Sequence, residues 1–200
     1  MDLGGSFLLL VTGPSGAGKT SLYEGLLAED ERLGFSVSCT TRAPRRGEVD
    51  GEDYHFIGRE DFERRRDAGE FVEWAEVHGN LYGTLISEVE RVARGGGIPA
   101  LDIDVQGGVQ VISRFQDDVC SIFVFPPSWE VLEQRLRGRG TDDEDAVRRR
   151  LANARHETAQ AGVYRYWIVN DDLRRAQDDL RAIIRAETLR SQRASGPPIA

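Results

Sequence analysis

Residues 13–20 read Gly13-Pro14-Ser15-Gly16-Ala17-Gly18-Lys19-Thr20 and fit G-x-x-x-x-G-K-[ST], the pattern of a phosphate-binding loop. An unbroken apolar run at residues 7–11 precedes the loop, as is typical of a buried strand in a parallel sheet. Residues 21–28 follow with apolar side chains at helical spacing. A strand, a glycine-rich turn and a helix start gather backbone N–H groups at the positive end of a helix dipole. The stretch therefore predicts an α/β fold that binds a nucleoside triphosphate, against the alternative of an ordinary glycine-rich turn.

Two side chains of this loop carry chemistry. Lys19 is expected to reach the β- and γ-phosphates, since this is the position of the phosphate-binding lysine in the pattern. The Thr20 hydroxyl is expected to be a ligand of Mg²⁺. The loop alone does not identify the second substrate, because such loops serve GTPases, ATPases and many kinases.

The composition is that of one globular domain. The chain has 200 residues, 40% hydrophobic and 30% charged. No apolar run approaches the roughly 18 residues of a membrane span, and the first residues lack the basic start of a signal peptide. A net charge of −8 argues against general binding to nucleic acid. We therefore expect a cytoplasmic protein without a nucleic-acid, membrane or obligatory protein partner.

Apolar and amphipathic segments alternate along the chain. Strands are predicted at residues 6–12, 35–40, 98–103, 119–125 and 167–170, and helices at 84–94, 106–114, 128–137 and 172–189. This alternation is typical of helices packed on a parallel sheet. Cys39 and Cys120 fall inside strand segments, so we expect buried, reduced thiols rather than a disulfide or a metal pair.

Two segments interrupt the alternation. Residues 42–83 combine a charged, turn-rich stretch with short strands and a hairpin turn at 78–80, which predicts a small, mostly antiparallel insertion. Residues 137–160 are rich in arginine, and the capping box Thr141-Asp142-Asp143-Glu144 predicts a helix to about Thr158. The predicted division is then a core of 6–41, 84–136 and 161–188, the two interrupting segments, and a flexible tail of 189–200.

Arg42 and Arg45 are candidate ligands of a second substrate. They follow a predicted strand and lie three residues apart. Arginine forks bind phosphate oxygens through paired hydrogen bonds, so the pair fits a terminal phosphate monoester. The alternative for any such cluster is a solvated face.

Glu73 is a candidate for recognition of a base. It lies between Val72 and Trp74 in a predicted strand, where alternation could place it inside or in solvent. An inward carboxylate needs donors, because burying an unpaired charge is costly. Guanine offers two adjacent donors, N1–H and the 2-amino group, whereas adenine has an acceptor at N1. Glu73 is therefore a chemically sensible partner of guanine.

Asp102 and Asp104 end an apolar strand and lie two residues apart, hence on one face of the predicted sheet. At the carboxyl end of a parallel strand they would point into the ligand crevice. Walker-B-type acids hold Mg²⁺ or its waters from such a position. The alternative is that they only cap the following helix.

Together these segments resemble the guanylate kinase family in its bacterial soluble form. The resemblance extends over about residues 6–188 and rests on residues 13–20, 35–45, 47–54, 71–74, 79–84, 101–104, 126–128, 135–140 and 168–172. It implies a P-loop core with a GMP-binding subdomain at 42–83 and a lid at 137–160. The implied reaction transfers the γ-phosphate of ATP to GMP, and to dGMP, giving ADP and GDP in purine nucleotide metabolism, with Mg²⁺ as cofactor.

The resemblance also implies roles for individual residues. The 5′-phosphate of GMP is expected to bind Arg42, Arg45, Tyr54 and Tyr82, and the base is expected to bind Ser38, Glu73, Thr84 and Asp104. Around ATP, the loop residues 13–20 are joined by Asn170 near the adenine and by Arg135, Arg139 and Arg150 on the phosphates. The expected catalytic set is Lys19, Arg42, Arg135, Arg139 and Arg150, and the expected metal ligands are Thr20 and, through water, Asp102. The chain departs from common family residues at Leu81, Thr84 and Arg165.

This reaction needs positioning more than acid–base chemistry. The nucleophile is a phosphate oxygen that is already ionised near neutral pH, so no general base is required. We expect the subdomain and the lid to close over both substrates and keep water out. Two alternatives stay open, namely a kinase for another nucleoside monophosphate and a non-catalytic binding module of the same fold. Glu73 and Asp104 argue against the first, and the complete loop argues against the second.

Overall fold

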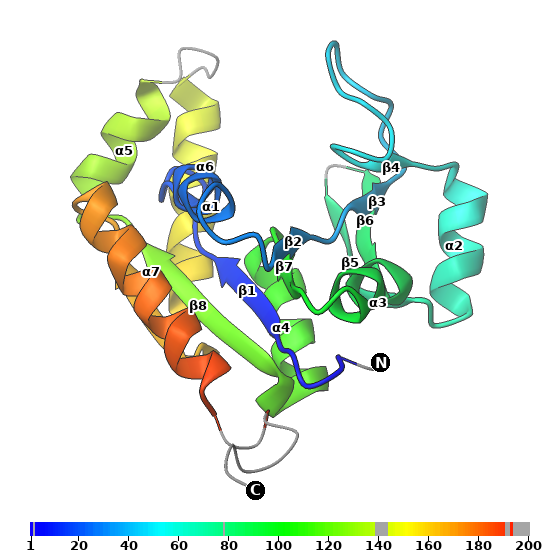
Figure 1. The fold of residues 1–200 in the computed structure, drawn as a ribbon. Helices are drawn as coiled ribbons and strands as arrows, with labels where there is room; N and C mark the ends of the chain where they lie inside the picture. The colour runs from blue at the N-terminus through cyan, green and yellow to red at the C-terminus, as the bar shows by residue number, and fades with distance from the viewer. Residues whose placement is uncertain (2, 78, 139–143, 191–192, 194–200) are drawn as a thin grey trace, which may run out of the picture.

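The structure is a computed structural model that describes residues 1, 3–77, 79–138, 144–190 and 193. Its centre is a five-stranded parallel sheet with the order β2-β7-β1-β8-β9. The strands are β1 (Leu8–Thr12), β2 (Leu33–Phe35), β7 (Ile98–Leu101), β8 (Val119–Phe125) and β9 (Tyr166–Val169). The α/β class predicted from the sequence is confirmed (Figure 1).

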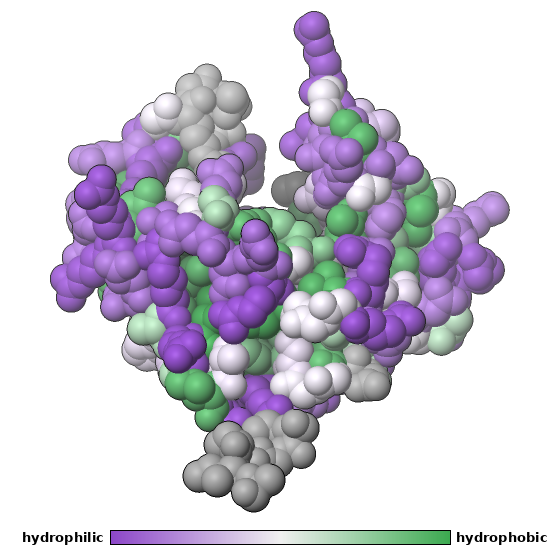
Figure 2. All heavy atoms as spheres, viewed as in Figure 1, coloured by the Kyte–Doolittle hydropathy of each residue, from purple (hydrophilic) through white to green (hydrophobic). Residues whose placement is uncertain are grey.

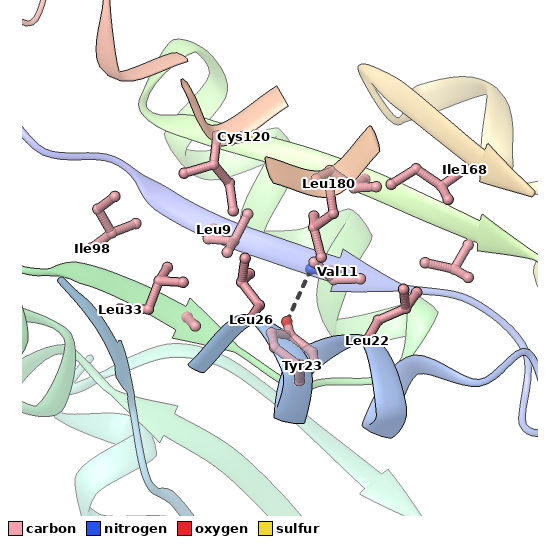
Figure 3. Close-up of a cluster of buried hydrophobic side chains, with 14 of the residues drawn as sticks. Leu9, Val11, Leu22, Tyr23, Leu26, Leu33, Ile98, Cys120, Ile168 and Leu180 are labelled. Carbon is pink, nitrogen blue, oxygen red and sulfur yellow. Dashed lines mark hydrogen bonds between the residues drawn. The ribbon is translucent and has the colours of Figure 1, made fainter. Parts of the chain in front are cut away.

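Helices cover both faces of this sheet because the side chains of β1 alternate between them. Leu9 and Val11 pack against α1 (Lys19–Leu27) and α7 (Leu173–Thr188) in one apolar cluster (Figure 3). Leu8 and Leu10 pack against α3 (Ile86–Arg94) and α4 (Val105–Phe115) in the other. All of β1 is buried, as expected for the central strand of a parallel sheet.

Tyr23 fixes α1 beneath the carboxyl edge of the sheet. The Val11 N–H donates to the Tyr23 hydroxyl oxygen at 3.2 Å (Figure 3), and the hydroxyl donates to the Leu101 carbonyl at 2.5 Å. The buried phenol thus joins the ends of β1 and β7. Residues 13–18, which connect β1 to α1, are held at that edge.

A second, four-stranded sheet stands beside the first, with the order β4-β3-β6-β5. Its strands are β3 (Ser38–Thr40), β4 (His55–Phe56), β5 (Phe71–Val77) and β6 (Asn80–Leu85). β6 pairs antiparallel with β3 and β5, and α2 (Arg59–Asp67) packs against this sheet through Phe62. The core of this unit is small and consists of Cys39, Phe62, Phe71, Leu81 and Leu85.

The single strand predicted over 35–40 is wrong. β2 ends at Phe35, opposite Ala100, and the Ser36 N–H makes a last bond to the Ala100 carbonyl at 3.1 Å. Because β7 stops at Leu101, the chain finds no further partner there and crosses to the second sheet. Cys39 and Cys120 are buried and free, as predicted, and burial raises the pKa of both thiols to about 12.

Helices α5 (Trp129–Arg137) and α6 (Glu144–Ala159) form a third structural unit. They pack through Leu132, Leu136, Val147 and Ala154. The first three residues of the predicted capping box lie outside the described residues. Figure 2 shows a hollow between this pair of helices and the second sheet. None of the described helices has both the length and the apolar character needed to cross a membrane.

Candidate active site

The phosphate-binding loop lies between β1 and α1. Gly18 precedes α1 with φ at +91°, and a Cβ on it would lie 2.3 Å from the Asn170 amide nitrogen, so only glycine fits. The Lys19 ammonium donates to the Gly13 carbonyl at 2.6 Å and to the Pro14 carbonyl at 3.3 Å. Thr20 is exposed in the first turn of α1. The loop therefore presents a helix N-terminus, an ammonium group and a hydroxyl at one edge of the sheet.

Arg135 and Asn170 lie directly against this loop. The Arg135 guanidinium donates to the carbonyls of Ala17 at 3.3 Å and Asn170 at 3.0 Å, and the Asn170 amide donates to Ala17 at 2.8 Å. A pocket beside the loop is lined by Gly16, Gly18, Ser21, Arg135, Asn170, Asp171 and Leu173. Arg150 lies half-buried on α6 and is absent from this described lining. Arg139 lies outside the described residues.

A second pocket opens between the two sheets. It is lined by Ser38, Tyr54, Glu73, Ala75, Val77, Tyr82, Gly83, Asp102, Ile103 and Asp104. Apolar side chains form part of its wall and carboxylates form another part, as suits a purine base with polar edges. Six of the residues that the sequence singled out meet here, although they come from segments more than 60 positions apart.

Glu73 is the buried carboxylate of this second pocket. The ladder between β5 and β6 shifts register between Phe71 and Glu73, so the carboxylate points inward, where Glu73 is only 5% exposed. Its Oε1 accepts from the Thr84 N–H at 3.0 Å and from the Thr84 hydroxyl at 2.9 Å. The Ser38 hydroxyl lies 2.9 Å from that of Thr84. Burial, helped by the charge of Asp104, raises the pKa of Glu73 to about 7.

Gly107 is a site residue that the sequence reasoning missed. A Cβ on it would lie 2.6 Å from Glu73 Oε2, so the bare backbone in the first turn of α4 leaves room for this carboxylate. The signal was the pair Gly107-Gly108 inside a predicted helix, where glycine is unfavourable unless something packs closely against it.

The strand predicted over residues 98–103 ends at Leu101. Asp102 and Asp104 therefore lie in the segment after β7 and not on the strand itself. Asp104 is the N-cap of α4 and accepts from the Gly107 N–H at 2.8 Å, so the capping alternative holds for this residue while it also lines the pocket. Burial raises the pKa of Asp102, and the positive charge of Lys19 opposes that rise.

The Asp102 carboxylate suits a magnesium ion shared with a nucleotide. Among the described residues, no group of three or more His, Cys, Asp or Glu side chains could hold a metal alone. Mg²⁺ bound to nucleotides takes one or two protein ligands and completes its shell with phosphates and water. Asp102, which feels the charge of Lys19 beside the loop, and the exposed Thr20 hydroxyl fit that donor set.

Tyr54 and Tyr82 form the end of the pocket that lies toward Arg42. Their ring centroids are 6.0 Å apart, and the Arg42 guanidinium carbon lies 5.5 Å from the centre of the Tyr54 ring. Burial raises the pKa of Tyr54, and the nearby Tyr82 adds to that rise. Arg45 is exposed on the loop after β3 and is absent from the described lining of the pocket.

A phosphate-binding loop on a parallel sheet, beside a second pocket with apolar walls and carboxylates, is typical of phosphotransferases of the nucleoside monophosphate kinase class. The family profile of guanylate kinase matches residues 6–187, so the chain belongs to the guanylate kinase family. Members of this family phosphorylate GMP with ATP, and the activity expected from the sequence is confirmed.

Individual relatives agree with this assignment. Guanylate kinase of Nitratidesulfovibrio vulgaris is 53% identical over 182 residues, covering 91% of this chain and 87% of the relative. That of Symbiobacterium thermophilum is 53% identical over 186 residues, covering 93% and 88%. The crystal structure of guanylate kinase from Anaplasma phagocytophilum superposes with a TM-score of 0.76 at 36% identity, covering 96% of this chain and 90% of that one. The SH3-kinase fragment of tight junction protein 3, at 10% identity and a TM-score of 0.51, shares the fold alone.

Proposed function

We propose that the chain phosphorylates GMP by holding the acceptor and ATP in the two pockets described above. The observation that carries this proposal is the buried Glu73 carboxylate. Thr84 occupies its Oε1, while Oε2 stays beside the bare backbone of Gly107 in a pocket with apolar walls. In its ionised form this group accepts hydrogen bonds only, which suits the N1–H and 2-amino donors of guanine.

Seven further residues complete the proposed acceptor site. Ser38, Thr84 and Asp104 surround the base together with Glu73. The bonds that join Ser38, Thr84 and Glu73, and the bond from the Gly107 N–H to Asp104, keep these oxygens in place. Arg42, Arg45, Tyr54 and Tyr82 are the proposed ligands of the 5′-phosphate. None of these proposed contacts involves the ribose 2′-hydroxyl, so dGMP is a second proposed acceptor.

The donor side uses the phosphate-binding loop. The backbone of residues 13–20 surrounds the ATP phosphates, Lys19 exchanges its bonds to Gly13 and Pro14 for phosphate oxygens, and Arg135 adds a second positive charge. Asn170 lies beside the adenine, and Arg139 and Arg150 approach the phosphates from the proposed lid, residues 137–160. Thr20 and, through water, Asp102 hold Mg²⁺, which neutralises charge on the phosphates when bound.

Transfer then depends on bringing the pockets together. The hollow between the second sheet and helices α5 and α6 leaves room for both units to close over the nucleotides, which would exclude water and prevent hydrolysis of ATP (Figure 2). The proposed moving units are residues 42–83 and 137–160, and the proposed location of the reaction is the cytoplasm.

The direct test is a coupled assay with ATP and, in turn, GMP, dGMP, AMP, CMP and UMP. The proposed site predicts that GMP has the highest kcat/KM. A higher kcat/KM for AMP than for GMP would contradict the proposed role of Glu73.

A further inference from the structure

Glu48 holds one edge of the Arg42 guanidinium. Its carboxylate oxygens accept from Arg42 Nη1 at 2.9 Å and Nη2 at 2.8 Å, and Oε2 also accepts from the Arg45 N–H at 2.6 Å. The two side chains are only 14% and 19% exposed. The bond from Arg42 lowers the pKa of Glu48 to about 2, so the carboxylate is ionised at any working pH. No motif of the sequence gave Glu48 a role, although it lies in a stretch that carries the family resemblance.

The bonds of Arg42 to Glu48 and to the Ala43 carbonyl leave one edge of its guanidinium for Tyr82 and for an incoming ligand. A guanidinium has five N–H donors. Both hydrogens of Nη1 are used, by Glu48 and by the Ala43 carbonyl at 2.7 Å, and one hydrogen of Nη2 is used by Glu48. The second hydrogen of Nη2 and that of Nε lie on the same side of the planar group. They form a two-donor fork of the kind that binds phosphate.

The surroundings of Arg42 give that fork a direction. The guanidinium packs against the rings of Tyr54 and Phe56, at 5.5 and 5.7 Å, and a hydrogen bond with Tyr82 contributes to raising its pKa. Tyr54 and Tyr82 line the pocket that also contains Glu73. The guanidinium thus contacts both Glu48 and two tyrosines that line the nucleotide pocket.

We propose that Glu48 is a positioning residue for the phosphate of GMP. By occupying the Nη1–Nη2 edge, it directs the Nε–Nη2 edge of Arg42 toward the pocket and restricts this long side chain before the substrate arrives. This inference rests on the proposed function, because it takes Arg42 as a phosphate ligand.

The competing interpretation is that Glu48 imitates the phosphate and must be displaced by it. A carboxylate and a phosphate oppose the same fork with two oxygens, so removing Glu48 would then strengthen GMP binding. If Glu48 instead positions Arg42, its removal weakens binding, since the arginine regains rotamers that must be lost again when GMP binds. The two interpretations therefore predict opposite signs.

The experiment measures KM for GMP, kcat and inhibition by guanosine for Glu48→Ala and Glu48→Gln. We expect Glu48→Ala to raise KM for GMP about tenfold and leave kcat within about twofold, as for loss of uniform binding. Inhibition by guanosine, which has no phosphate, should not change. Glu48→Gln should raise KM by a smaller factor, because the amide keeps one of the two accepting oxygens and replaces the other with an NH2 donor. Glu60→Gln, which removes an exposed carboxylate from α2 of the same unit, is the matched control and should change nothing.

Every other outcome overturns the proposal. A lower or unchanged KM for GMP would show that Glu48 competes or is irrelevant, and weaker inhibition by guanosine would show a general disturbance of the unit. If Glu48→Ala does not fold, the nearly isosteric Glu48→Gln gives the same sign. Kinetics of the unmodified protein with GMP and AMP test the proposed function separately. If the unmodified protein does not prefer GMP over AMP, the proposed function is rejected, whatever the results for the Glu48 variants.

Discussion

The two nucleotide pockets are built from different parts of the chain, the donor pocket mainly from backbone and the acceptor pocket from side chains. The donor side is one continuous stretch, residues 13–20, whose backbone and Lys19 are fixed between the central strand and a helix. The acceptor side is assembled from separate side chains on β3, β5, β6 and the segment after β7. It also rests on a much smaller apolar core. The donor loop acts through backbone N–H groups and Lys19, whereas the acceptor pocket depends on single side-chain atoms of residues such as Glu73.

Lys19→Ala tests the donor side and should have the largest effect. The ammonium is the charged side chain within the loop itself, and losing one preorganised electrostatic contact to the transferred group costs on the order of 10²- to 10³-fold in kcat. Folding should be unaffected, because the Lys19 ammonium donates to the carbonyls of Gly13 and Pro14 within its own loop. Steady-state kinetics and a thermal melt measure the two properties separately. A large drop in melting temperature would show that Lys19 serves the fold instead.

Glu73→Gln tests the acceptor side. The amide keeps an oxygen for Thr84 but places N–H donors against the donors of guanine. A mismatched buried group costs about 1–3 kcal/mol, so kcat/KM for GMP should fall roughly ten- to a hundredfold. Glu76→Gln is the matched control, because Glu76 lies on the same strand but its side chain is 52% exposed. Equal losses in both variants would remove Glu73 from its proposed role.

Gly107→Ala tests how closely the acceptor pocket depends on space. The added Cβ would press on Glu73 Oε2 from 2.6 Å, and the carboxylate would have to turn away from the position described. We expect KM for GMP to rise about tenfold, with KM for ATP unchanged, as for loss of one charged hydrogen bond. Gly58→Ala, in the same unit but with no atom within 4 Å of the new Cβ, is the control. Normal kinetics in Gly107→Ala would mean that the Glu73 carboxylate has another position available.

The pH dependence should show the smallest effect. Because burial raises the pKa of Glu73 from 4.5 to about 7, the folded protein binds more protons than the unfolded chain between these values, and this group lowers stability as pH rises through that window. Binding of guanine changes with pH in the opposite direction. It strengthens as pH rises, because it needs the ionised Glu73 carboxylate. Guanosine lacks the phosphate of GMP, so the phosphate does not titrate in the same pH range. Inhibition by guanosine should weaken about fivefold when the pH is lowered from 7 to 6. A flat profile, equal to that of Glu73→Gln, would contradict this assignment.

The sequence predicted the donor side more completely than the acceptor side for a physical reason. A loop whose work is done by backbone leaves a contiguous pattern of glycines, and its flanking strand and helix show the expected periodicity. Side chains that meet only after folding leave no local pattern, so Ser38, Tyr54 and Tyr82 entered through family resemblance rather than through their own chemistry.

The ends of strands that depend on contacts with other elements could also not be predicted from the sequence. The crossing from β2 to β3 at Ser36 follows from where β7 ends, and the sequence shows a continuous strand-like run there. The bulge that turns Glu73 inward and the space left by Gly107 depend on contacts between β5, β6 and α4. The bonds of Arg42 to Glu48 required the conformation of a charged loop, which periodicity does not give.

Calorimetric titration of GMP alone tests the separation of the two pockets most directly. Lys19→Ala should bind GMP with the dissociation constant of the unmodified protein, while Glu73→Gln should bind it roughly ten- to a hundredfold more weakly. Loss of GMP binding in Lys19→Ala, or unchanged binding in Glu73→Gln, would contradict the account of a donor pocket made by the loop and an acceptor pocket made by the second sheet.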